Sequence, residues 1–166
     1  MAIMKKLRAL AKDLPTENAT LHGKMIIEKR SVLTGEITET IVIDNLVCNT
    51  GKNTIAARLN GETVLTNGIL NYMAVGTGTN IPAVSDTTLQ TEIARTTVSS
   101  NSRSLNIATI TFFFGSASGN GTLREAGAFF DGTPTLNSGA LFDRVNINVT
   151  KTTADTLTIT LIVTVN

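Results

Sequence analysis

The sequence predicts a mainly β protein, built as an antiparallel β-sandwich or a flattened barrel. Short segments rich in Val, Ile, Thr and Phe recur along most of its 166 residues, and clusters of Gly, Asn, Ser and Pro separate them. The last segment, Thr156–Val165, alternates Thr with aliphatic residues up to Ile162. Such alternation gives a strand one apolar face, as expected for a sheet that covers a core on one side.

The chain begins with an amphipathic segment. Apolar side chains recur there at spacings of three and four, with basic residues between them: Ile3, Met4, Leu7 and Leu10. This pattern predicts a helix, which Pro15 ends. We expect an N-terminal helical arm and connector over residues 1–20 and a β-sandwich domain over residues 21–166. Packing on its own domain or a neighbouring subunit is the favoured role of the arm, and binding to a membrane surface or to nucleic acid are the alternatives.

A β-hairpin and a helix are expected next. Leu21–Arg30 and Ile37–Ile43 have strand composition and are joined by a turn that contains Gly35. Asn49 or Thr50 is then expected to cap a short helix, which Asn60-Gly61 ends.

The same helical segment contains Gly51-Lys52, which resembles part of a phosphate-binding loop. The match fails because Leu46 stands where that loop needs its first glycine, and Asn53 stands where a Ser or Thr should follow the lysine. We therefore interpret this segment as structural.

A strand, a rigid loop and a second short helix are predicted over residues 69–92. Ile69–Val75 is an apolar run long enough for a buried strand, and two glycines and a proline follow it: Gly76, Gly78 and Pro82. Ser85 or Asp86 could then cap a helical turn over Thr87–Glu92.

The rest of the chain is expected to be β-strand, around residues 93–100, 105–114, 123–130, 140–149 and 155–165. Phe112, Phe113 and Phe114 interrupt the alternation, so at least one of these rings should point away from its own core. A neighbouring subunit could cover it. With the two predicted helices, this gives about eight strands and the β-sandwich or flattened barrel stated above.

One set of motifs resembles a known group of proteins. The segment Tyr72–Thr79, followed by Pro82, Asp86-Thr87-Thr88-Leu89, Glu92 and Arg95, is similar to a signature of structural proteins of tailed bacteriophages. Two later pieces also fit, Leu123–Phe129 and Leu141–Val145 with Lys151-Thr152 after it. The resemblance covers roughly residues 49–165 and implies a tail-fibre, collar or other virion component, with no catalytic residue.

Composition disfavours several other classes of function. The formal charge of +1 gives no reason to expect nucleic acid or an anionic membrane as partner. Aromatic residues make up 4% of the chain and Trp is absent, which disfavours sugar-binding platforms and single-strand-binding surfaces. His22 is the only histidine, so a metal site built on two histidines is excluded. Cys48 is the only cysteine, and its apolar neighbours predict a buried structural thiol.

Two acidic residues lie close to arginines and allow two interpretations. Glu92 with Arg95, and Glu125 with Arg124, are expected to form ion pairs that hold loops on the sheet. The alternative is that Glu92 and Glu125 are the carboxylates of a glycosidase, which the shortage of sugar-stacking aromatics disfavours. A calcium site at Asp131-Gly132 or in the Asp86 loop is conceivable, although no spacing requires one.

We therefore expect a non-enzymatic component of a tailed-phage particle, made in the host cytoplasm and located in the virion. Its partners would be further copies of itself and other tail or capsid proteins, with no cofactor, metal, nucleic acid or membrane. A tail, collar or fibre-attachment position is favoured, with a capsid decoration protein and a host-surface glycan-binding module as alternatives. The candidate assembly contacts are Ile3, Met4, Leu7, Leu10, Phe112, Phe113 and Phe114. The candidate structural loop motif is Gly76, Gly78, Pro82, Asp86, Glu92, Arg95 and Glu125.

Overall fold

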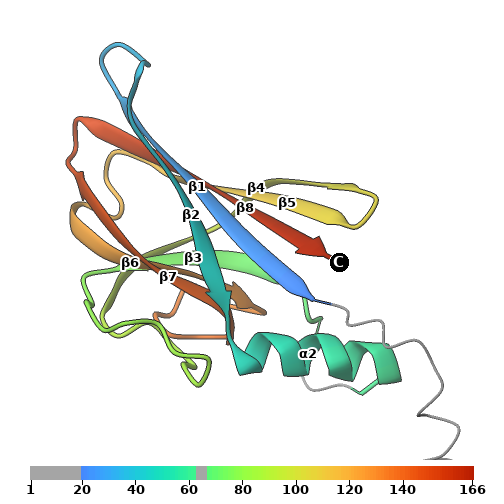
Figure 1. Cartoon of the computed structure of the whole chain (residues 1–166). Helices are drawn as coiled ribbons and strands as arrows, with labels where there is room; N and C mark the ends of the chain where they lie inside the picture. Colours follow the sequence, from blue (N-terminus) through green and yellow to red (C-terminus); the bar gives the residue numbers. More distant parts are fainter. Residues whose placement is uncertain (1–19, 63–66) are drawn as a thin grey trace, which may run out of the picture.

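A computed structural model of the chain describes residues 20–62 and 67–166, and these form a closed antiparallel barrel of eight strands (Figure 1). The predicted β class is confirmed. The strands are β1 (Leu21–Ser31), β2 (Ile37–Val47), β3 (Leu70–Gly76), β4 (Glu92–Ser104), β5 (Ile107–Phe114), β6 (Gly121–Phe130), β7 (Ala140–Lys151) and β8 (Asp155–Val165), and the helix is α2 (Asn49–Asn60). The predicted N-terminal helix lies outside the described residues.

Around the barrel the strands follow the order β1-β2-β7-β6-β3-β4-β5-β8. Two strands join the two sides of the barrel by changing partner along their length. β4 pairs with β3 up to Thr97 and with β5 from Val98 onward. β2 pairs with β1 over most of its length and meets β7 only at Leu46 and Val47. We call the two places where β4 and β2 change partner the corners of the barrel. The closed barrel agrees with the flattened barrel that the sequence predicts.

The interior of the barrel holds the main hydrophobic core. Inward-facing residues alternate along the strands, as in β8, where the fully or nearly fully buried residues are Leu157, Ile159, Leu161 and Val163. The predicted split of the phenylalanine run is confirmed. Phe112 and Phe114 are buried in this core, whereas Phe113 points outward with 48% of its surface exposed.

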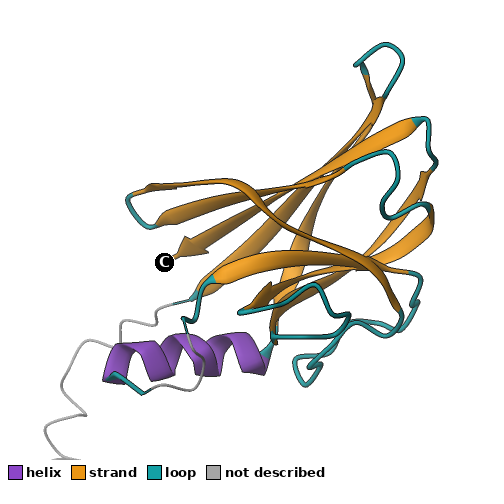
Figure 2. Cartoon of the chain, turned by 180° about the vertical axis from the view of Figure 1, so that it is seen from behind, coloured by secondary structure: helices purple, strands orange, loops and turns teal. Residues whose placement is uncertain are grey.

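A second, smaller apolar cluster lies on the outer side of the barrel. It contains Cys48, Ala74, Leu89, Phe129 and Leu141. Leu89 comes from the long loop between β3 and β4, so this cluster fastens that loop to the sheet by burial of apolar surface. One outer side of the barrel is therefore covered by loops, as Figure 2 shows for the teal segments beside the strands.

The predicted first hairpin is confirmed, and its turn contains Gly35 at a φ of 72°. The hairpin projects beyond the barrel, and the β4–β5 hairpin projects in another direction (Figure 1). The two ends of the described chain meet, because the Thr20 N–H donates to the Asn166 carbonyl at 2.7 Å and the Asn166 N–H donates back at 2.9 Å.

Helix α2 ends where the sequence predicts, with Gly61 in the left-handed conformation at a φ of 78°. The predicted cap at its start is wrong. The N-cap is Cys48, which makes no side-chain cap bond, and the Asn49 N–H donates instead to the Val84 carbonyl of the β3–β4 loop at 2.8 Å. A tertiary contact thus replaces the local cap.

The predicted helical turn over Thr87–Glu92 is also wrong, because this segment is an irregular loop that leads into β4 at Glu92. Asp86 does not cap it, since its carboxylate accepts from the Ala83 N–H at 2.9 Å and pairs with Arg144. Several strand boundaries also differ from the prediction. β2 and β4 run on to Val47 and Ser104, and Leu105, at a φ of 51°, belongs to the β4–β5 turn instead of β5.

Candidate functional site

Glu125 is the centre of the candidate site. It comes from β6, and its side chain is 0% exposed beneath the β3–β4 loop. Its Oε1 accepts from the Gly78 N–H at 3.0 Å and the Thr91 N–H at 2.7 Å, and its Oε2 accepts from the Gln90 N–H at 2.9 Å. One carboxylate therefore holds the first and last parts of the loop at the same point, with charge-assisted bonds.

Arg144 of the neighbouring strand β7 neutralises this buried charge. Its guanidinium lies 2.9 Å from the Glu125 carboxylate and 2.6 Å from the Asp86 carboxylate, and it also donates to the Asn80 carbonyl at 3.2 Å. The predicted pairing of Glu125 with Arg124 is wrong. The reason is the register of β6 against β7, which places Arg144 opposite Gly127 and thus beside Glu125 on the outer side of the sheet.

The glycines of the loop motif are required by these close contacts. A Cβ at Gly76 would lie 2.3 Å from the Thr91 carbonyl oxygen, and one at Gly78 would lie 2.4 Å from Oε1 of Glu125. Gln90 fixes the next part of the loop, because its Oε1 accepts from the N–H groups of Thr79 and Asn80, both at 2.8 Å. Pro82, which is half-buried, follows in the same loop. The backbone over residues 76–91 is thus held at many points.

Glu92 and Arg95 form the second ion pair, and here the predicted partners do meet. The Arg95 Nε lies 2.5 Å from Oε1 of Glu92, and the side chains of Arg95 and Glu92 are 2% and 0% exposed. Arg95 also donates to the carbonyls of Thr133 and Ser138, both at 3.0 Å, while Glu92 accepts from the Asn137 N–H at 2.8 Å. This pair fastens the β6–β7 loop to the outer side of the barrel.

Aromatic rings support the same pair. The Arg95 guanidinium carbon lies 4.9 Å from the centre of the Phe129 ring and 5.4 Å from that of Tyr72, within the range of cation–π attraction.

Both glutamates of the glycosidase alternative, Glu92 and Glu125, are thus buried and bound by hydrogen-bond donors. An acid or base for sugar hydrolysis has to reach its substrate, and neither carboxylate is open to solvent in this arrangement.

Asp143 is a buried ionisable group that the sequence reasoning did not single out. It is 0% exposed and accepts from the Ala128 N–H at 3.0 Å and from the Asn45 amide nitrogen. Burial raises the pKa of its carboxyl to about 7, against the pull of these two hydrogen bonds. The motif Leu141–Val145 contains Asp143 and Arg144, so the signal lay in the sequence, but their partners are set by strand register.

Cys48 is buried, as predicted, with 0% of its surface exposed. Burial, together with the nearby negative charges of Asp143 and Asp86, raises the pKa of its thiol to about 11. A thiol with such a pKa stays protonated near neutral pH and is a poor nucleophile.

The two carboxylates considered for calcium are both bound by protein donors. Asp131 accepts from the N–H groups of Asn67, Gly68 and Ile69 at 2.7, 2.9 and 3.3 Å. Burial opposes ionisation of this carboxyl, but the three N–H donors outweigh it and lower the pKa. Asp86 is held by Ala83 and Arg144, as described above. Within residues 20–62 and 67–166, no group of three His, Cys, Asp or Glu side chains is placed to hold a metal ion.

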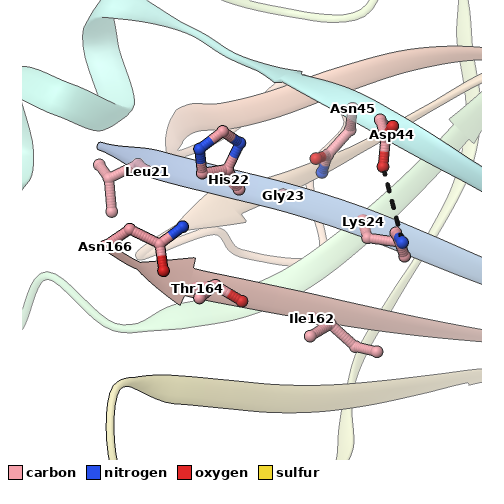
Figure 3. Close-up of a pocket in the computed structure, with 9 residues that line it drawn as sticks. All are labelled: Leu21, His22, Gly23, Lys24, Asp44, Asn45, Ile162, Thr164 and Asn166. Carbon is pink, nitrogen blue, oxygen red and sulfur yellow. Dashed lines mark ion pairs between the residues drawn. The ribbon is translucent and has the colours of Figure 1, made fainter.

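A shallow hollow of about 510 Å³ lies where β1 begins, between β2 and β8 (Figure 3). His22 lines it, together with the exposed ion pair of Lys24 and Asp44, whose nearest atoms are 3.9 Å apart. The Nε2 atom of His22 lies 3.3 Å from the Thr20 hydroxyl. Among the described residues His22 makes no other side-chain hydrogen bond, so we do not assign a binding role to this hollow.

The remaining predicted contacts are distributed as follows. Ile3, Met4, Leu7 and Leu10 lie outside the described residues. Phe113 lies on the outer side of β5, where its neighbour across the strand pair is Thr158 of β8. Ile81 and Val84, which the sequence reasoning did not select, stand on the fastened β3–β4 loop with 86% and 43% of their surfaces exposed.

Two further findings bear on function. In the part of the chain that the structure describes, α2 is too short and too polar to span a membrane as a helix. No protein family model, curated protein sequence or solved structure matches the chain. The resemblance to phage structural proteins therefore stays a prediction that depends on the motifs alone.

Proposed function

We propose that this chain is a non-enzymatic structural component of a tailed-phage particle, which associates with copies of itself and docks on other particle proteins. The observation that carries this proposal is the fastened β3–β4 loop. The buried ion pair of Glu125 and Arg144 and the apolar anchor Leu89 fix its backbone, and the loop displays Ile81 to solvent with 86% of its surface exposed. An exposed apolar residue on a rigid support can bind a partner without a large cost of ordering.

The chemistry of the site supports docking over catalysis. The ionisable groups of the motif are used inside the protein, where they bind loops to the sheet. The surface above them, from Gly76 to Thr91, consists mainly of backbone, hydroxyl, amide and aliphatic groups. Docking on such a surface would depend on shape and apolar burial. The motif resemblance favours a tail, collar or fibre-attachment position, and a capsid decoration role is the alternative within the same class.

Complementation of a phage that lacks this chain would test the proposal. The wild-type chain, supplied from a plasmid, should be incorporated into gradient-purified particles. The variant Ile81→Asp should fold normally and be incorporated much less, because it places a charge in the proposed contact. Leu59→Asp is a matched control, since Leu59 is also 86% exposed but lies on α2. Absence of the wild-type chain from the particles would overturn the proposal.

A further inference from the structure

The tip of the β1–β2 hairpin is unusually apolar for a projecting turn. We use "hairpin tip" for residues 32–37, in which Val32, Leu33 and Ile37 are 55%, 93% and 45% exposed. Backbone hydrogen bonds hold its shape, from the Gly35 N–H to the Ser31 carbonyl at 2.9 Å and from the Ser31 N–H to the Glu36 carbonyl at 3.0 Å. A fixed turn that exposes three aliphatic side chains loses little conformational entropy when a partner covers it.

A recess with an apolar lining lies between β3 and the last part of β4. It has a volume of about 310 Å³, and we call it the end pocket. It exists because β4 leaves β3 after Thr97, which opens a gap in the pairing at this corner of the barrel. The lining residues are Ile69, Leu70, Ala108, Ile110 and Phe130, with Asn101, Ser102 and Arg103 along β4.

The hairpin tip and the end pocket lie at opposite ends of the barrel. Strand pairing shows this, because Ser31 pairs with Asp155 at the first residue of β8, whereas Ile107 pairs with Thr164 near its last residue. In Figure 1 the β1–β2 hairpin accordingly projects away from the β4–β5 hairpin, next to which the pocket lies. A single copy cannot bring the two together.

We propose that the hairpin tip of one copy inserts Leu33 into the end pocket of the next copy. Charge supports a second copy as the occupant. Glu36 is the charged residue of the tip, and Arg103 is the charged residue among those that line the pocket in the described chain. The two are of opposite sign, so an approaching tip would be attracted and oriented. This proposal rests on the proposed function and specifies how the copies meet.

A contact of this kind is head-to-tail, because different surfaces of the two copies meet. Repetition gives a ring if the rotation between copies closes and a filament if it does not. The tip is small, so the buried area should fall below the ~1,200 Å² of a stable complex. Association is therefore expected to be weak in solution and to strengthen where a particle holds the copies side by side.

Sedimentation velocity of the full-length chain over a concentration series tests the proposal. The wild type should associate reversibly at high concentration. Leu33→Asp, Glu36→Lys and Arg103→Glu should each reduce this association at least tenfold, while Glu36→Lys combined with Arg103→Glu should restore it. Leu59→Asp should have no effect, because Leu59 is 86% exposed but lies outside both surfaces. All of these positions are on the surface, so circular dichroism should show the wild-type fold.

Mixing gives the sharpest result. Leu33→Asp keeps an intact pocket and Arg103→Glu keeps an intact tip, so an equimolar mixture should form a one-to-one pair and nothing longer. A wild type that is monomeric at every concentration, or a charge exchange that fails to restore association, would overturn the proposal. So would association that survives Leu33→Asp but is lost in Leu7→Asp, which would make the N-terminal arm the contact. These experiments test only the contact between copies. Whether the chain is present in phage particles is tested separately, by the complementation experiment described above.

Discussion

The substitution Glu125→Gln tests most directly whether the motif residues act as structural fasteners. The glutamine oxygen could still accept from the N–H groups of Gly78 and Thr91, which now share Oε1. Its amide nitrogen would take the place of Oε2, where it would face two donors, the Gln90 N–H and the Arg144 guanidinium. The change is nearly isosteric, so its effect should come from lost charge and opposed donors and not from a cavity.

The expected cost follows from the environment of Arg144. This side chain is 3% exposed, and after the substitution only the partly exposed Asp86 would balance its charge. Breaking a buried ion pair by removing one partner typically costs about 3–5 kcal/mol. A domain of this kind has a total stability of roughly 5–15 kcal/mol, so the variant should be folded but clearly weakened.

Urea denaturation followed by circular dichroism measures this loss, and hydrogen exchange localises it. The amides of Gly78, Gln90 and Thr91 should lose protection in Glu125→Gln before the barrel strands do. Arg124→Gln is the matched control: Arg124 precedes Glu125 on β6 but is half-buried, and its replacement should change stability by no more than about 0.5 kcal/mol. Unchanged stability together with unchanged protection of the three amides would refute the structural role of Glu125.

Three further predictions concern buried groups. Burial raises the pKa of Asp143 from 3.8 to about 7, so the native state holds the carboxyl proton more tightly than the unfolded chain does. The contribution of Asp143 to the free energy of unfolding should therefore fall by up to about 4 kcal/mol as the pH rises from 4 to 7. In Asp143→Asn, denaturation at several pH values should no longer show this decrease in the free energy of unfolding. The same pH dependence in both proteins would contradict the raised pKa of Asp143. Gly78→Ala should lower the free energy of unfolding by about 1–3 kcal/mol, because its methyl group would meet Glu125 at 2.4 Å, and an unchanged midpoint in urea would be inconsistent with that contact. The Cys48 thiol should be inert to an aromatic disulfide reagent at pH 8 in the native protein and reactive in urea; rapid native labelling would show that it is open to solvent.

The strands and turns were largely predictable because their signals are local. Alternation marked β8, Gly35 marked the first hairpin, and Gly61 marked the end of α2, since each depends on the preferences of adjacent residues. The outward-facing ring in the run Phe112–Phe114 could be predicted for the same reason, because three consecutive side chains on a strand cannot all face one side.

The candidate site was only half predictable because half of it depends on strand register. Glu92 and Arg95 lie three residues apart, and their pairing could be expected from the sequence. Glu125 and Arg144 are joined by irregular pairing of β6 with β7, in which the register shifts between Leu123 and Glu125 and again between Ala128 and Phe129. No local pattern states where such shifts fall.

The predicted helical turn after Asp86 failed for a related reason. Asp86 followed by polar residues satisfies the local rule for a cap, but Arg144 takes its carboxylate from a distant strand. The end pocket was likewise invisible in the sequence, because it arises where β4 exchanges one partner strand for another. Surfaces made by topology require the fold to be known first.

Quantitative mass spectrometry of purified phage particles is the most direct test of the central claim, that this chain is a structural component of the particle. The account predicts peptides of the chain in gradient-purified particles, at a fixed number of copies that does not change with further purification. Peptides that are abundant in the infected cell but missing from the particles would contradict it.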